Sequence, residues 1–360
     1  MNLKRLTDAQ GNPVRLVCAD PTQLQVKKAL VEAVLDGSIV ISGPEGGTLS
    51  YNLSDTWKAN GESALTAVVA EMQAWGNDAI PFFIQTDLHG RNNDPARWLH
   101  NLNDRIMNIN LGDNATDYFN TGELEAYYES VRDVQNKICV FGNHDVWTKS
   151  GSDKAANYHD LAQWFPSDGK RIRDKHGYFT VKDDRFNVKY VVLCPYYINL
   201  ENETNGVDLA IRTAQMEWLI HELSADDGYD IVILMHQLFH DDYQNREGVK
   251  QNWSDAQPIF QQVWNVLKDR RNNRSGSVTD SNAQTHSYDF SNVKSRILCA
   301  LHGHTHEELM VTEEGMTAYA ANWYGDGGAC VIGVINRERG KLKIWAFGAN
   351  SVSDVLELDI

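Results

Sequence analysis

Residues 137–145 read KICVFGNHD, and this stretch decides the fold prediction. A short apolar run typical of a buried strand ends abruptly in polar residues, and a helix is predicted before it over 121–136. The same order recurs around PFFIQTD (81–87) and IVILMH (231–236), after helices predicted over 63–75 and 208–224. Such alternation of helices with apolar strands predicts a layered α/β domain with buried strands.

Residues of the types that bind metals stand where the predicted strands end. The five strand ends read TDLHG (86–90), GDN (112–114), GNHD (142–145), His236 and HGHTH (302–306). In α/β sheets, ligands gather beyond the carboxyl ends of the strands. The five strand ends are therefore predicted to converge on one site.

The donor groups at these strand ends are imidazoles and carboxylates, without a thiolate. Such a set suits Mn, Fe, Zn, Ni or Co rather than Ca or a cysteine-bound structural zinc. One carboxylate can bridge two cations about 3.5–4 Å apart. Because residues i and i+2 of an extended segment point to the same side, the segments 87–89 and 304–306 are each expected to present two side chains to one site.

The motif order D-x-H, G-D, G-N-H-D, H and G-H-x-H resembles the calcineurin-like metallophosphoesterase superfamily. The resemblance covers roughly residues 80–321, and Gln215, Trp218 and Leu219 are similar to the family's Q-x-x-W-L helix. It implies more than an α/β fold: a four-layer αββα sandwich of two mixed β-sheets flanked by helices. We expect this domain over residues 61–360, after a small N-terminal appendage over 1–60.

The resemblance implies that seven side chains hold two divalent metal ions, for which Mn is the favoured element. They are Asp87, His89 and His306 for one ion, Asn143, His236 and His304 for the other, and Asp113 as the bridge between them.

The resemblance also implies two catalytic residues. His144 is expected to protonate the leaving-group oxygen or to stabilise the transition state, and Asp145 to orient and charge that imidazole. The nucleophile would be a metal-bound hydroxide, and the reaction the hydrolysis of a phosphate mono- or diester. Two departures from the family's motifs make two of its branches poor matches for this chain. The segment 112–117 lacks the VDRG extension of Ser/Thr protein phosphatases, and Thr116 stands where purple acid phosphatases have a tyrosine ligand.

The composition bears on partners. The formal net charge is −16, from 33 Lys and Arg against 49 Asp and Glu, so the surface repels phosphate backbones. A small phosphorylated substrate is therefore expected, with nucleic acid only as a substrate. The five cysteines are scattered and lack CxxC spacing, and no apolar run approaches the length of a signal or membrane segment. These features predict a cytoplasmic protein that does not bind a membrane.

Three further regions carry weaker predictions. Within 1–60 we expect a helix over 24–35 and short strands at 38–42 and 48–52, in a piece that could bind a protein partner. The polar segment 275–289 is interpreted as a mobile loop, and the loops 146–180 and 240–295 as the regions that select the substrate. Candidates for substrate contact, each with a structural interpretation that is at least as good, are Arg91, Asn92, Trp147, Tyr196, Tyr197, His240 and Asn322.

Two alternatives to a small-molecule phosphoesterase remain open at this point. One is a nuclease of the same chemistry, against which the acidic composition speaks. The other is a non-enzymatic assembly protein with a vestigial metal site, which only the unassigned residues 1–60 favour.

Overall fold

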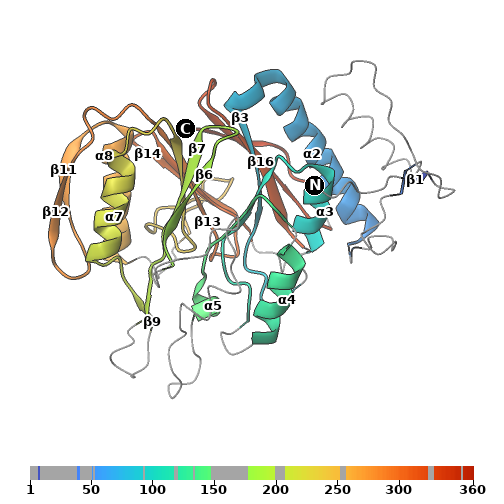
Figure 1. Ribbon diagram of the computed structural model, residues 1–360, viewed down its shortest axis with the longest axis horizontal. Helices are drawn as coiled ribbons and strands as arrows, with labels where there is room; N and C mark the ends of the chain where they lie inside the picture. Colours follow the sequence, from blue (N-terminus) through green and yellow to red (C-terminus); the bar gives the residue numbers. More distant parts are fainter. Residues whose placement is uncertain are drawn as a thin grey trace. The chain divides into compact units, whose positions relative to one another are not determined.

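Two six-stranded mixed sheets carry the strand ends described above. The strands of the first sheet are β6 (Phe179–Asp183), β7 (Val188–Val192), β10 (Asp230–Leu234), β13 (Ile297–His302), β14 (Leu309–Glu313) and β15 (Met316–Ala320). Those of the second are β3 (Ala79–Gln85), β4 (Met107–Asn110), β5 (Lys137–Cys139), β16 (Cys330–Asn336), β17 (Lys341–Phe347) and β18 (Leu356–Asp359). Their orders are β14-β15-β13-β10-β7-β6 and β18-β17-β16-β3-β4-β5. Figure 1 shows strands of both sheets between α7 (Thr213–Ser224) and α8 (Pro258–Arg271) on one side and α2 (Asp55–Trp75) and α3 (Asp94–Leu102) on the other.

This structure is a computed structural model. It describes residues 7–8, 39–40, 51, 53–91, 94–116, 121–132, 134–146, 177–198, 207–251, 257–322, 328–349 and 352–360. The chain separates into two units, Met1–Asn52 and Leu53–Ile360, which are treated separately.

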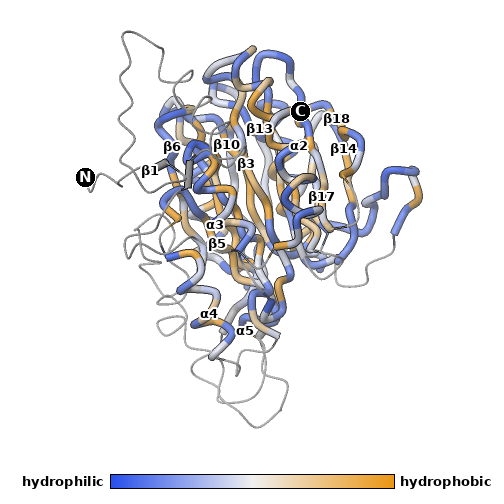
Figure 2. The backbone as a smooth tube through the Cα atoms, turned by 90° about the vertical axis from the view of Figure 1, so that its right-hand side faces the viewer, coloured by the Kyte–Doolittle hydropathy of each residue, from blue (hydrophilic) through white to orange (hydrophobic). Residues whose placement is uncertain are grey.

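The two sheets of the larger unit pack face to face. Alternate residues of a strand point to opposite faces, and β10 shows this clearly. Its Val232 and Leu234 belong to an apolar cluster built from both sheets, whereas Ile231 and Ile233 belong to a second cluster with the helices. Strands buried on both faces read as continuous apolar runs, as Figure 2 shows along β3 and β10.

Helices cover the outer faces of both sheets. On the first sheet, α7 (Thr213–Ser224) and α8 (Pro258–Arg271) pack through Leu219 and Trp264. On the second lie α2 (Asp55–Trp75), α3 (Asp94–Leu102) and α4 (Thr121–Val131). The 3-10 turn η1 (Gly76–Asp78) leads from α2 into β3, and α5 (Asn143–Val146) follows β5. The predicted four-layer αββα sandwich is confirmed.

The segment 275–289 is a hairpin, so the prediction of a mobile loop is wrong. Strands β11 (Ser275–Thr279) and β12 (Thr285–Asp289) pair antiparallel. Val278, His286 and Tyr288 are buried while the Ser and Thr residues between them face outward. Buried and exposed residues alternate along these strands, but the polar composition of the segment made this alternation hard to recognise in the sequence. The region 240–295 is likewise not one loop, because it also contains α8.

Little of the first unit is described. Strand β1 (Thr7–Asp8) pairs antiparallel with β2 (Ile39–Val40), which falls within the predicted strand 38–42. The predicted helix 24–35 and nearly all of the strand 48–52 lie outside the described residues. Since α2 begins at Asp55 with Ser54 as its N-cap, the predicted appendage 1–60 includes the start of this helix, and the division at residue 60 stays a prediction.

Two smaller expectations can be compared with the described residues. Cys139, Cys194, Cys299 and Cys330 are buried thiols, and none of these four is joined to another by a disulfide. None of the helices described is both long enough and apolar enough to cross a membrane.

Strands β8 (Tyr196–Ile198) and β9 (Val207–Leu209) form a further small antiparallel pair.

Candidate metal centre

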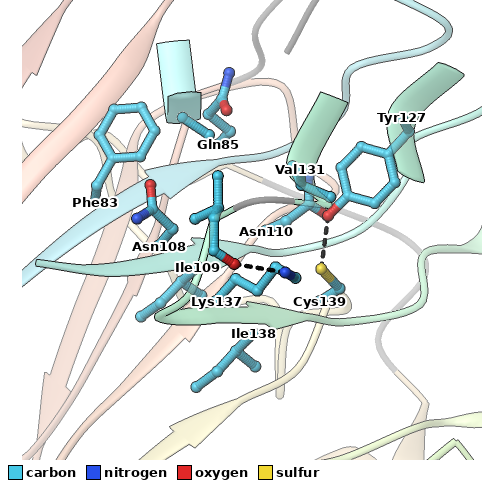
Figure 3. A pocket seen from close by; sticks show the side chains of 12 residues that line it. Phe83, Gln85, Asn108, Ile109, Asn110, Tyr127, Val131, Lys137, Ile138 and Cys139 are labelled. Atoms are coloured by element: carbon cyan, nitrogen blue, oxygen red, sulfur yellow. Dashed lines mark hydrogen bonds between the residues drawn. The ribbon is translucent and has the colours of Figure 1, made fainter. Parts of the chain in front are cut away.

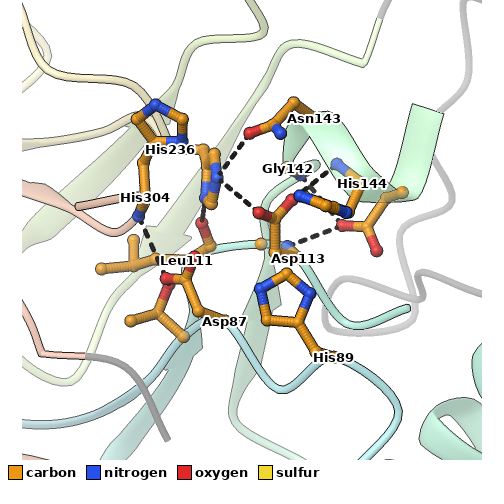
Figure 4. A network of polar contacts seen from close by, with 12 residues as sticks. Asp87, His89, Leu111, Asp113, Gly142, Asn143, His144, His236 and His304 are labelled. Atoms are coloured by element: carbon orange, nitrogen blue, oxygen red, sulfur yellow. Dashed lines mark hydrogen bonds and ion pairs between the residues drawn. The ribbon is translucent and has the colours of Figure 1, made fainter. Parts of the chain in front are cut away.

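The seven predicted ligands meet at one edge of the sandwich, and both sheets contribute to the cluster (Figure 4). In the second sheet, β3, β4 and β5 are parallel neighbours whose ends lead to Asp87, Asp113 and Asn143. In the first sheet, β10 and β13 are parallel neighbours whose ends lead to His236, His304 and His306. The convergence expected from the sequence therefore results from two groups of adjacent parallel strands.

The first group is Asp87, His89 and His306, whose ligand atoms lie within 4.8 Å of one another. His306 Nε2 is 3.3 Å from His89 Nε2 and 3.1 Å from Asp87 Oδ1. Asp87 Oδ2 is held by the Thr86 hydroxyl and the His304 amide, whereas buried Oδ1 accepts no hydrogen bond from the described residues. Its contact with His306 lacks hydrogen-bond geometry, so Oδ1 is placed as a metal ligand would be.

The second group is Asp113, His236 and His304, and Asn143 joins it. His236 Nε2 lies 3.2 Å from Asp113 Oδ2 and 3.2 Å from Asn143 Oδ1. His236 Nδ1 donates to the Leu111 carbonyl at 2.6 Å. Histidine ligands typically donate a hydrogen bond from one ring nitrogen to a carbonyl, which leaves the other ring nitrogen to face the metal.

Asp113 lies between the two groups. Its carboxylate is within 4.8 Å of a ring nitrogen of His236 and also of His89, in an overlapping group with His144. The groups Asp87–His89–His306 and Asp113–His236–His304 share no residue, so they can hold separate ions with Asp113 between them. The donor set fits two divalent cations of the kind that take imidazole and carboxylate ligands.

Five of the seven predicted ligands have a left-handed backbone. Their φ values are 54° for Asp87, 45° for His89, 56° for Asp113, 74° for His304 and 56° for His306. Non-glycine residues rarely adopt this conformation, and such strain clusters at functional sites. The expectation that 87–89 and 304–306 are extended is wrong: each pair converges because both residues turn, not because alternate residues share a face.

Two glycines of the motifs allow the loops to approach closely. A Cβ on Gly142 would lie 2.1 Å from Asp113 Oδ1, and one on Gly303 would lie 2.0 Å from the Thr86 hydroxyl oxygen. Any side chain at either position would displace a ligand loop.

The floor of the site is buried and negatively charged, and its rim is open. The side chain of Asp113 is 2% exposed, and that of His306 is 39% exposed. Burial acts to raise the pKa of Asp113, but the charge and hydrogen bonds of His236 and His144 lower it overall. Burial acts to lower the pKa of His236, yet Asp113 raises it to about 9. In the absence of a cation, a proton on His236 thus balances the negative charge of Asp113, which a bound cation would otherwise balance.

Asp145 holds the backbone of the ligand loops. Its carboxylate accepts hydrogen bonds from the backbone amides of Gly142, Asp113, Asn114 and Ala115, at 2.8–3.1 Å. His144 Nδ1 instead lies 2.7 Å from the Thr116 carbonyl oxygen. Asp145 therefore fixes the ligand loops, and its predicted role of orienting the imidazole of His144 stays a prediction.

His144 stands where the sequence predicts a catalytic group. Its ring meets that of His89 edge-on, with centroids 4.6 Å apart, and its amide donates to Asp113 Oδ1 at 2.8 Å. Thr116 and Glu123, which hold the far side of His144, were not predicted as site residues. Only the structure reveals them, since the contact to His144 comes from a backbone carbonyl.

The weaker candidates for substrate contact do not all lie near the site. Tyr196 is buried near the site, with its ring 6.5 Å from that of His236. His240 is buried against Tyr243 and Trp264 and has no place among the ligand groups. Arg91 is exposed. Asn92, Trp147 and the side chain of Tyr197 lie outside the described residues.

A small pocket elsewhere contains none of the predicted site residues. It lies between α4 and β4–β5, has room for roughly one water molecule, and contains the 2.6 Å contact between Tyr127 Oη and Cys139 Sγ (Figure 3). We interpret it as a packing feature.

Comparisons with solved structures find weak similarity. A dimetal phosphatase from Danio rerio is 14% identical, with 78% of this chain and 98% of that chain covered and a TM-score of 0.49. PhoD is 12% identical, with 78% and 70% covered and a TM-score of 0.46. GAP50, the anchor in the inner membrane complex of Plasmodium, is 10% identical, with 78% and 89% covered and a TM-score of 0.41. Scores this low carry no functional argument.

Comparison of sequences is more decisive. No curated protein matches significantly. The model of a family described as calcineurin-like phosphoesterase matches residues 80–308, a range that includes all seven predicted ligands. The chain therefore belongs to the calcineurin-like phosphoesterase family.

Proposed function

We propose that the protein hydrolyses the ester bond of a small phosphorylated substrate, a phosphate mono- or diester, with two divalent cations. Membership of the family supports metal-dependent phosphoester hydrolysis. The observation that carries the proposal for this chain is the convergence of its ligands on left-handed backbone, because strain of this kind persists only where the surrounding structure maintains it. A vestigial site would have no need of it.

Each ligand has a defined part in the proposal. Asp87, His89 and His306 would hold one cation, and Asn143, His236 and His304 the other. Asp113 would bridge them. When bound, the cations would activate water and neutralise charge on the phosphoryl oxygens, with Mn as the favoured element.

The protein side chain proposed to act on the substrate is His144. Its Nδ1 is bonded to a carbonyl, so we assign the proton for the leaving-group oxygen to Nε2 of the protonated ring. The exposed rim at His306 lies beside His89 and leaves this side of the site open to a substrate.

The formal net charge of −16 supports a small substrate over a polymer, since a long phosphate backbone would be repelled along its length. The nuclease alternative has no observation in its favour among the described residues.

The test is hydrolysis of p-nitrophenyl phosphate beside bis(p-nitrophenyl) phosphate by Mn-loaded protein. Asp113→Ala is expected to remove activity on both substrates while the fold is kept, because it removes the bridge. Faster monoester cleavage would indicate a phosphatase or nucleotidase, and faster diester cleavage a phosphodiesterase.

A matched control is Glu338→Ala. Glu338 is exposed after β16, whose last residue Asn336 pairs with Ala79 at the end of β3 remote from the ligands, so wild-type rates are expected. Wild-type activity in Asp113→Ala would contradict the proposal. Protein that binds no metal and cleaves neither ester would favour the non-enzymatic alternative.

A further inference from the structure

A chain of polar contacts leads from the first turn of α4 to the imidazole of His144. Glu123, in that turn, accepts a hydrogen bond from the Thr116 amide through Oε2 at 2.6 Å. The Thr116 carbonyl then lies 2.7 Å from His144 Nδ1. Glu123 and His144 therefore hold the two sides of the same residue, one through its amide and the other through its carbonyl.

Thr116 is also tied to the first motif. Its hydroxyl oxygen lies 3.1 Å from the His89 carbonyl oxygen and 3.3 Å from Glu123 Oε1, and its single proton can go to one of them at a time. Gly90 lies against the carboxylate of Glu123, where an added Cβ would come within 2.3 Å of the carboxyl carbon. Glu123 thus packs between the loop that carries His89 and the loop that carries Thr116.

The chemistry of a carbonyl gives this chain a consequence for His144. A carbonyl oxygen only accepts hydrogen bonds, so the Nδ1 that faces it must carry the proton. In the neutral ring, Nε2 is then the unprotonated nitrogen. It must first take up a proton, which gives the imidazolium, and donation of that proton to the leaving-group oxygen returns the neutral ring with its proton on Nδ1. The N–H and the C=O of Thr116 belong to successive peptide units that meet at its Cα. Glu123 accepts from the amide and lies 3.3 Å from the hydroxyl oxygen, so it restrains the Cα from which the carbonyl extends towards His144.

We propose that Glu123 and Thr116 are positioning residues that set the tautomer and orientation of His144. This inference rests on the proposed function, since it concerns the histidine proposed to protonate the leaving group. Glu123 does not reach the substrate in this proposal and acts only through the Thr116 peptide.

The kinetic test compares Glu123→Ala with Glu123→Gln on Mn-loaded protein. The substrates are the p-nitrophenyl and phenyl esters of whichever phosphate class is cleaved. The Ala variant is expected to lose about 10-fold or more in kcat on the phenyl ester, whose leaving group needs a proton, and clearly less on the p-nitrophenyl ester. KM and metal content should not change. The Gln variant keeps an acceptor for the Thr116 amide and should restore most of the rate.

Two comparisons separate positioning from general damage. Glu125→Ala changes an exposed residue of the same helix and should leave both rates unchanged. In a His144→Ala background, Glu123→Ala should have no further effect, because the group through which it acts is gone. Equal losses on both esters, or an additional loss in the His144→Ala background, would overturn the proposal.

A readout without turnover distinguishes this proposal from the proposed function. Nitrogen NMR of histidine-labelled, Zn-loaded protein reports the tautomer of each ring, and His144→Ala assigns the signal. Wild type should show His144 protonated on Nδ1, and Glu123→Ala should shift it toward a mixture of tautomers while Glu125→Ala does not. A wild-type signal from the Nε2–H tautomer would overturn the positioning role. The expected spectra without any hydrolysis would instead uphold the positioning role and contradict the proposed function.

Discussion

Asp145 shows at the scale of one residue how the metal loops are held. Oδ1 accepts from the amides of Asn114 and Ala115, and Oδ2 from those of Asp113 and Gly142. One fully buried carboxylate therefore fixes the loop of Asp113 and the loop that leads to Asn143. Charge-assisted hydrogen bonds of this kind are stronger than neutral ones.

Asp145→Asn is expected to destabilise the fold by about 2–4 kcal/mol, because an amide NH₂ would face two backbone N–H groups that lose their acceptor. Metal binding should fall with it, since both loops lose their anchor. Urea denaturation and metal analysis measure the two effects, with exposed Asp241→Asn as the control. A variant of unchanged stability that loses only turnover would instead support the role first predicted for Asp145, that of orienting His144.

The sequence predicted which residues form the site, but it did not predict their backbone geometry. Metal-ligand residue types at successive strand ends indicate Asp87 or His304 without any structure. The left-handed backbone of these residues leaves no trace in residue type, since Asp and His also occur in extended segments. Thr116 was equally hidden, because a backbone carbonyl that accepts from His144 is present whatever its side chain.

At the scale of one element, the β11–β12 hairpin depends on its turn. Asp280 is buried, and its carboxylate accepts from the Thr213 hydroxyl at 2.6 Å and from the amides of Asn282 and Gln284. His286 Nε2 lies 2.8 Å from Asp280 Oδ2. Burial acts to raise the pKa of Asp280, but these hydrogen bonds lower it to about 2. The hairpin is thus connected to α7 through one ionised carboxylate.

This depressed pKa predicts a pH dependence. A carboxyl group whose pKa is lower in the folded state stabilises the fold above its ordinary pKa of about 4, and the contribution is lost as the pH falls towards 2. Asp280→Asn is therefore expected to cost about 1–2 kcal/mol at pH 7 and progressively less between pH 4 and pH 2. Denaturant titrations across this range measure the difference from wild type, with Asp241→Asn again as control. A constant difference at every pH would contradict the assignment.

Elements with a strong hydrophobic period were the ones that the sequence predicted. β3, β5 and β10 are short, mostly apolar runs, and α2 and α7 follow apolar residues at helical spacing. The β11–β12 hairpin was missed because only its inward residues are large, while its outward ones are small and polar. Small polar residues suit loops and exposed strand faces equally well, so composition alone could not decide.

For the whole molecule, the sequence alone supported an α/β domain, and the four layers followed from the resemblance to the family. The order of strands in two sheets depends on contacts between residues far apart in the chain, such as β3 beside β16 and β13 beside β15. Periodicity is local and contains no information about such pairs. A protein partner for residues 1–60 stays a prediction, since few of these residues are described.

The metal centre connects the two sheets, because Asp87, Asp113 and Asn143 follow strands of one sheet and His236, His304 and His306 follow strands of the other. Ions bound there would cross-link the layers and stabilise the folded state by mass action, by about 2.7 kcal/mol at a free concentration of 100 times Kd. For a domain of this size, Mn²⁺ should raise the Tm by roughly 5 °C or more over chelator-treated protein. Thermal unfolding with EDTA and then with excess Mn²⁺ measures the shift, and Asp113→Ala should respond much less because it lacks the bridge. An equal response of wild type and Asp113→Ala would mean that the ions stabilise the protein somewhere other than between its sheets.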